Sequence, residues 1–183
     1  MLDEQQRKVL LKVAREAVEA AAENVPYALQ TDDPVLQEIG AAFVTLRSHG
    51  NLRGCIGTVE PREPLIENVA AMARAAARED PRFQPVEAAE VPDLKIEISI
   101  LTPPKRVADV EEITVGTHGL IVEQGPQRGL LLPQVPVEWH WNREQFLDHT
   151  CLKAGLPKGC WRIGADIFSF TAEIFGEEDE PSP

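Results

Sequence analysis

The sequence predicts an α+β protein with a mostly antiparallel sheet flanked by helices. Three observations indicate this class: apolar residues recur at helical spacing in three segments, they alternate with period two in several others, and short turns join neighbouring strands. Strands joined by hairpins and interrupted by helices favour antiparallel pairing over parallel strands linked by crossover helices. The 183 residues are therefore expected to form one compact unit.

Each predicted helix begins or ends with a known signal. Asp3 and Asn142 are predicted N-caps, because a glutamine follows each of them three positions later. The second helix has a proline suited to a first turn, and its alanine-rich stripe allows close packing. The helical segments are residues 3–25, 61–80 and 142–155.

The predicted strands form two hairpins and two single strands. One hairpin turns at residues 49–51, and the other turns at Gly125 and Pro126. Residues 94–101, with the sequence LKIEISIL, alternate apolar with polar side chains, as a half-buried strand does. Residues 166–175 form the last predicted strand.

Composition and charge argue against several classes of partner. The formal net charge is −12 and the sequence has no basic stripe, so binding to nucleic acid is not expected. No apolar run approaches the ~20 residues of a membrane-spanning helix. The N-terminal sequence lacks a basic region followed by an apolar one, which predicts a cytoplasmic protein. The acidic residues 177–183 are predicted to be a disordered tail after a domain of residues 1–176.

The sequence contains three cysteines, Cys55, Cys151 and Cys160. An odd number without CxxC spacing predicts neither a disulfide framework nor a zinc site, so we expect reduced thiols. Helical spacing places Cys151 on the side of its helix that faces the protein core. Cys55 is therefore the cysteine of interest for chemistry.

Residues 52–57, with the sequence LRGCIG, form the most distinctive stretch of the second predicted strand. Period-two alternation places Arg53 and Cys55 on one face, where a guanidinium would favour the thiolate and hold an anionic ligand. Gly54 and Gly57 would keep this surface clear, and Leu52 and Ile56 would point into the core. The alternative is structural: Cys55 is a small buried residue and the glycines permit close packing.

Other candidate residues follow the second helix and flank the second hairpin. Asp80 is either a proton carrier with Arg82 as an anion clamp, or the cap of a turn that pairs with Arg82. His118 lies between glycines at a strand entrance, and Gln134 follows a buried strand, so either could line a site or merely complete a turn. No combination of side chains has the pattern of a metal site.

The LRGCIG hexapeptide resembles the motif of the AMMECR domain family, known in prokaryotes as AmmeMemoRadiSam system protein A. Further segments match the family in the same order, among them DPRFQPV, LKIEISILTPP, VGTHGLIVEQG, FLDHTCLKAGLP and IFSFTAEIF. The resemblance implies two subdomains, with the hexapeptide near a cleft, and a gene association with Memo-like and radical SAM proteins. It implies that residues 52–57 belong to the functional site. It implies the same, with lower weight, for Asp80, Arg82, His118 and Gln134.

Two functions are consistent with these residues. The first is an enzyme or enzyme component in which Cys55, assisted by Arg53 and by Asp80 or His118, acts on a small anionic substrate. The second is a non-catalytic module that presents the hexapeptide to a Memo-like or radical SAM partner or to a peptide. The sequence indicates no particular cofactor.

Overall fold

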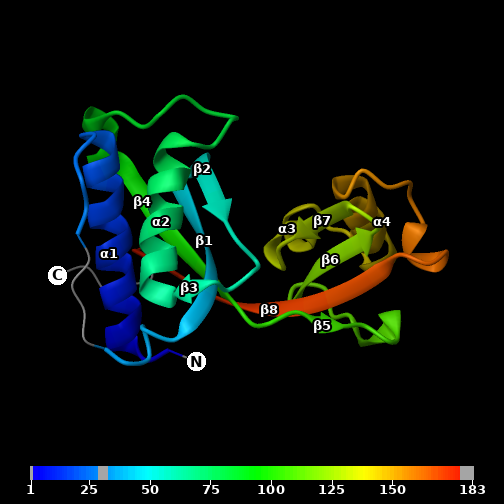
Figure 1. The fold of residues 1–183 in the computed structure, drawn as a ribbon. Helices are drawn as coiled ribbons and strands as arrows, with labels where there is room; N and C mark the ends of the chain where they lie inside the picture. Colours follow the sequence, from blue (N-terminus) through cyan, green and yellow to red (C-terminus); the bar gives the residue numbers. More distant parts are fainter. Residues whose placement is uncertain (1, 29–32, 178–183) are drawn as a thin grey trace. The chain divides into compact units, whose positions relative to one another are not determined.

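The computed structural model describes residues 2–28 and 33–177, and the chain divides into two compact units. Of the described residues, unit 1 comprises those up to Leu101 and those from Glu173 to Glu177, and unit 2 comprises residues 102–172. Each has an antiparallel sheet and helices (Figure 1), which confirms the α+β class. The last strand, β8 (Asp166–Gly176), begins in unit 2 and ends in unit 1.

Unit 1 places its helices on one face of a sheet. Its strands lie in the order β2, β1, β4, and β8 follows β4. The short β3 pairs with the start of β1. The elements are α1 (Glu4–Ala22), β1 (Ile39–Ser48), β2 (Asn51–Gly57), β3 (Glu63–Pro64), α2 (Leu65–Arg78), the 3-10 helix η1 (Ala88–Asp93) and β4 (Leu94–Leu101).

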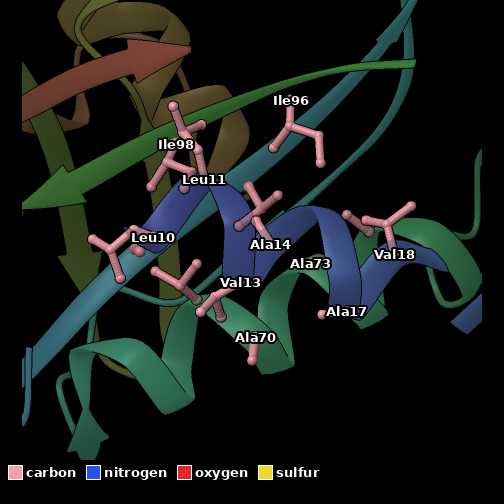
Figure 2. Close-up of a cluster of buried hydrophobic side chains, with 14 of the residues drawn as sticks. Leu10, Leu11, Val13, Ala14, Ala17, Val18, Ala70, Ala73, Ile96 and Ile98 are labelled. Atoms are coloured by element: carbon pink, nitrogen blue, oxygen red, sulfur yellow. The ribbon is translucent and has the colours of Figure 1, made fainter. Parts of the chain in front are cut away.

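The core of unit 1 lies between the helices and the sheet. Figure 2 shows apolar side chains of α1 directed toward Ile96 and Ile98 on β4, with Ala70 and Ala73 of α2 beside them. The alanines bring the two helices close together, as their spacing predicts. On β1 and β4 the even-numbered residues face this core, so the odd-numbered residues face the opposite side of the sheet.

Local sequence signals set the ends of the helices as expected. The Asp3 side chain accepts a hydrogen bond from the backbone of Gln6, and Gln6 reaches back to Asp3, which completes a capping box. Asn142 and Gln145 make the same pair of bonds at the start of α4. Among residues 2–28 and 33–177, no helix is long and apolar enough to cross a bilayer.

Unit 2 has a smaller sheet covered by a helix. The strands β6 and β7 form the second predicted hairpin, and β8 lies between β6 and β5. Phe146, Leu147 and Cys151 of α4 are buried against the sheet. The elements are β5 (Lys105–Arg106), the 3-10 helix η2 (Val110–Glu112), β6 (His118–Gln124), β7 (Gln127–Leu131), α3 (Gln134–Glu138), α4 (Arg143–Lys153) and the 3-10 helix η3 (Cys160–Arg162).

The expectation of three reduced cysteines is wrong, because Cys151 and Cys160 form a disulfide. Their Cα atoms are 6.2 Å apart, and both residues are fully buried. A turn at Gly159, in the left-handed conformation with φ 78°, brings η3 back toward α4. Asp148 fixes this turn by accepting a hydrogen bond of 2.9 Å from the backbone N–H of Gly159.

Glu177, which was predicted to belong to a disordered tail, is bound to unit 1. Its carboxylate forms an ion pair with Arg15 and accepts a 2.9 Å hydrogen bond from the backbone N–H of Ile96. Arg15 lies on α1, and Ile96 lies on β4. The ordered chain therefore extends at least to Glu177, and the rest of the predicted tail, residues 178–183, lies outside the described residues.

We predict that a chain ending at Glu177 keeps wild-type stability, whereas a chain ending at Gly176 loses about 1–2 kcal/mol. The shorter chain lacks the carboxylate that pairs Arg15 and satisfies the N–H of Ile96. Thermal unfolding of both truncations measures the difference, which corresponds to a Tm decrease of about 2–8 °C. Equal Tm values would show that these contacts add nothing to stability.

Candidate functional site

The hexapeptide lies on β2, where an irregularity interrupts the alternation of side chains. Gly54 pairs with Leu46 of β1, and the next pair is Leu52 with Arg47, so Arg53 has no counterpart on β1. Such a β-bulge re-aims the side chain of the extra residue. The alternation expected between Arg53 and Cys55 is therefore interrupted, and Arg53 is not among the charged groups that shift the pKa of Cys55.

Arg53 is fully engaged by protein groups. Its Nε and Nη2 atoms donate hydrogen bonds of 2.9 and 3.0 Å to the carboxylate of Glu90. Its Nη1 atom donates to the carbonyl of Gln84 at 3.0 Å. The bidentate pair raises the pKa of Arg53 and lowers that of Glu90. Arg53 therefore fastens the segment after α2 to β2. Its Nε and Nη2 groups bind Glu90 and are not available to an anionic ligand.

Asp80 and Arg82 cover the outer edge of β2 at Cys55. Asp80 Oδ2 accepts a 2.9 Å hydrogen bond from the backbone N–H of Cys55, and Arg82 Nη2 donates to the carbonyl of Cys55 at 3.4 Å. Arg82 also binds both carboxylate oxygens of Asp80, at 2.9 and 2.7 Å. The two side chains thus replace a neighbouring strand at an exposed sheet edge.

Asp80 is held as a carboxylate rather than as a proton carrier. The hydrogen bond from Arg82 lowers its pKa well below the ordinary range, and the backbone N–H of Cys55 adds to this effect. Its side chain is only 2% exposed. These contacts match the structural alternative for Asp80 and Arg82.

The two glycines of the motif lie against other parts of unit 1. A Cβ atom on Gly54 would be 2.2 Å from the carbonyl oxygen of Ala76 on α2. A Cβ atom on Gly57 would be 2.2 Å from the Phe43 ring. Protein atoms therefore occupy the space beside both glycines. Ile56 pairs with Val44 and packs against the core of unit 1, as predicted.

Cys55 is the only free cysteine among the described residues, and it is partly buried. Burial raises the pKa of its thiol, and the charges of Asp80 and Glu97 act in the same direction. A 3.3 Å hydrogen bond from Thr45 Oγ1 to the sulfur and the charge of Arg82 oppose this shift but do not reverse it. The prediction that Arg53 lowers the pKa of Cys55 is therefore wrong.

Cys55 lies in a polar row that crosses three strands, and this row was not among the predicted features. Thr45 lies opposite Cys55 on β1, and Glu97 lies opposite Thr45 on β4. Ser99 follows on the same face, with an exposed fraction of 1% and no hydrogen-bond partner for its Oγ atom among the described residues. The alternation within residues 94–101 placed Glu97 and Ser99 on one face, but only the strand register places Glu97 in the row of Thr45 and Cys55 and Ser99 in the next row, with Phe43 and Gly57.

His118 and Gln134 belong to unit 2, whereas the other predicted site residues belong to unit 1. His118 begins β6, and its Nδ1 atom accepts a 3.0 Å hydrogen bond from the backbone N–H of Thr114. Gln134 begins α3, and its buried Oε1 atom has no hydrogen-bond partner among the described residues. Within the described ranges, no cluster of His, Cys, Asp and Glu has the arrangement of a metal site.

We predict that Asp80→Asn destabilises the protein by about 2 kcal/mol at pH 7, because the amide removes the charge-assisted bonds of the clamp. A carboxyl whose pKa is lowered by folding adds stability above its unfolded pKa of about 3.9, and this stability declines as the pH falls below that value. The difference from wild type should therefore shrink between pH 7 and pH 3, as measured by urea unfolding.

The control for Asp80→Asn is Asp166→Asn, because Asp166 pairs with Arg106 at an exposed site. This exposed pair should contribute less than about 1 kcal/mol. A loss for Asp80→Asn that is the same at pH 3 and pH 7 would contradict the charged clamp.

The chain belongs to the AMMECR1 family, whose model matches residues 11–175. It is 44% identical over 187 residues to a protein of Methanothermobacter thermautotrophicus, with 97% of each chain covered. It is 45% identical to a protein of Thermococcus onnurineus, with 95% of this chain and 91% of the relative covered. The crystal structure of the uncharacterized protein PH0010 from Pyrococcus horikoshii is similar, with a TM-score of 0.92, 42% identity and coverage of 97% and 94%. The fold and family predictions are therefore confirmed.

Proposed function

We propose that this protein is a non-catalytic binding protein that uses β2 and the segment along its edge to bind a partner protein. One observation carries the proposal: the two charged groups that would assist Cys55 chemistry, Arg53 and Asp80, are both bound by other side chains. A thiol with a raised pKa, whose candidate base Asp80 is bound by Arg82, is poorly suited to nucleophilic catalysis.

The outer side of β2 offers a rigid surface for recognition. Leu52, which alternation placed in the core, is instead 37% exposed on this strand. Two charge-assisted clamps, Arg53 with Glu90 and Asp80 with Arg82, hold the segment of residues 80–90 along the same edge. A surface that is already ordered loses little conformational entropy on binding. The family resemblance suggests Memo-like and radical SAM proteins as partners.

Isothermal titration calorimetry with purified Memo-like and radical SAM proteins from the same genome tests this proposal. Leu52→Ala should weaken binding about tenfold, because loss of a buried leucine contact costs ~1.5 kcal/mol or more. Ile39→Ala is the matched control, since Ile39 is a 67% exposed apolar residue of unit 1 outside β2. Absence of binding to both proteins, or equal losses for the two variants, would contradict the proposal.

The second candidate is an enzyme or enzyme component that acts on a small anionic substrate through Cys55. One observation favours it: the Thr45 hydroxyl donates to the sulfur, and a hydrogen bond of this kind stabilises a thiolate. In this case the proton carrier would have to be a group other than Asp80. The reactivity of Cys55 as a function of pH distinguishes the two candidates.

A further inference from the structure

We infer that two copies of this protein associate through an aromatic stack on unit 2, formed by Trp139, Trp141 and His149. The Trp141 and His149 rings are parallel within 1°, with centroids 3.8 Å apart. The Trp139 ring continues the stack at 6.1 Å and 18° from Trp141. None of these residues belongs to the surface proposed above, so this inference is independent of the proposed function.

The outer end of the stack is unusually exposed for a tryptophan. Trp139, the C-cap of α3, is 66% exposed, and Val137, two positions earlier on α3, is 52% exposed. His140, between the two tryptophans, has a positive φ of 53°, which is uncommon for a residue other than glycine. An uncommon backbone conformation and an exposed large aromatic side chain are both features of recognition surfaces.

The flat ring at the end of the stack favours a second copy as its occupant. A two-fold symmetric interface brings the same patch of each chain together, so the patch must be complementary to itself. An exposed indole face meets this requirement, because two such faces can stack in offset geometry. The Trp139 ring of one copy would then extend the aromatic stack of the other copy.

The distribution of charge also permits association through this unit. Two chains that each carry a net charge of −12 repel one another. The excess of acidic residues lies in unit 1, whereas residues 102–172 contain nearly equal numbers of acidic and basic residues. Unit 2 is therefore the part of the chain through which two copies can approach with little repulsion.

The size of the patch sets the strength of the dimer. A tryptophan buries about 150–250 Å² when it is fully covered. Trp139, Val137 and part of Trp141 thus supply a few hundred Å² from each copy, and the sum for two copies lies below the about 1,200 Å² in total at the lower end of specific interfaces. We therefore expect a weak dimer, with a dissociation constant in the micromolar range or above.

Sedimentation velocity of the full chain from about 1 to 500 µM tests the inference. The wild type should shift from monomer to dimer across this range, and added salt should strengthen the dimer because it screens the repulsion. Trp139→Ala and Val137→Ser should each weaken association at least tenfold. Ile163→Ala is the control, because Ile163 is a 74% exposed apolar residue of unit 2 outside the stack.

Far-UV circular dichroism and urea midpoints establish that the variants are folded. A wild type that is monomeric at every concentration overturns the inference, whatever other molecule binds Trp139. Dimerisation that is unaffected by both stack variants, or weakened by added salt, overturns it as well.

Discussion

Gly54→Ala is expected to destabilise unit 1 by about 3 kcal/mol, at the upper end of the usual cost of overpacking. The added methyl group would lie 2.2 Å from the carbonyl oxygen of Ala76, which is a backbone atom of α2. To relieve this contact the helix must move away from β2. The buried residues Ala73, Ala76 and Ala77 hold it in place. Urea unfolding of the variant measures the loss.

Gly176→Ala is the matched control for the Gly54 prediction. Its added Cβ atom would meet the carbonyl oxygen of Ile96 at 3.2 Å, which a small shift relieves, so we expect a loss below about 1 kcal/mol. If Gly54→Ala is as stable as Gly176→Ala, close packing does not explain the glycine. Access of a ligand to β2 would then become the better explanation.

Replacement of both Cys151 and Cys160 with serine is expected to destabilise unit 2 by about 3 kcal/mol. The disulfide joins residues nine positions apart, and a closed loop of this size restricts the unfolded chain by roughly that amount. Both residues also lie in the buried cluster of unit 2, so serine hydroxyls there would need new partners. Urea unfolding with and without a reducing agent measures the effect.

Cys55→Ser is the control, because Cys55 lies in unit 1 and is free. This variant should lose stability on reduction by the same amount as the wild type, and the double serine variant should not respond to reduction. A wild-type protein that is insensitive to the reducing agent under unfolding conditions would contradict a stabilising disulfide.

Features that depend on neighbouring residues could be predicted from the sequence. The two capping boxes, Asp3 with Gln6 and Asn142 with Gln145, formed as expected because each needs only one helical turn. Alternating side chains likewise predicted β4, with its apolar side facing the core. The order of several segments that resemble the family indicated the family correctly.

Most interactions of the candidate site could not be predicted, because they join residues far apart in the chain; the pair of Asp80 and Arg82, two positions apart, is the exception. The bulge at Arg53 and its pairing with Glu90, 37 positions away, redirect a side chain that alternation placed beside Cys55. The Cys151–Cys160 disulfide depends on the turn at Gly159. No spacing rule for short motifs contains this information.

The central claim is that the hexapeptide is a structural element in which Cys55 is a protonated thiol at neutral pH. The most direct measurement is the rate of Cys55 alkylation against pH, followed by peptide mass spectrometry, in the native protein and in urea. Because burial raises the pKa of Cys55, the native midpoint should lie above the midpoint of the unfolded chain. A native midpoint below that of the unfolded chain, with rapid alkylation at pH 7, would contradict the claim and favour the enzyme.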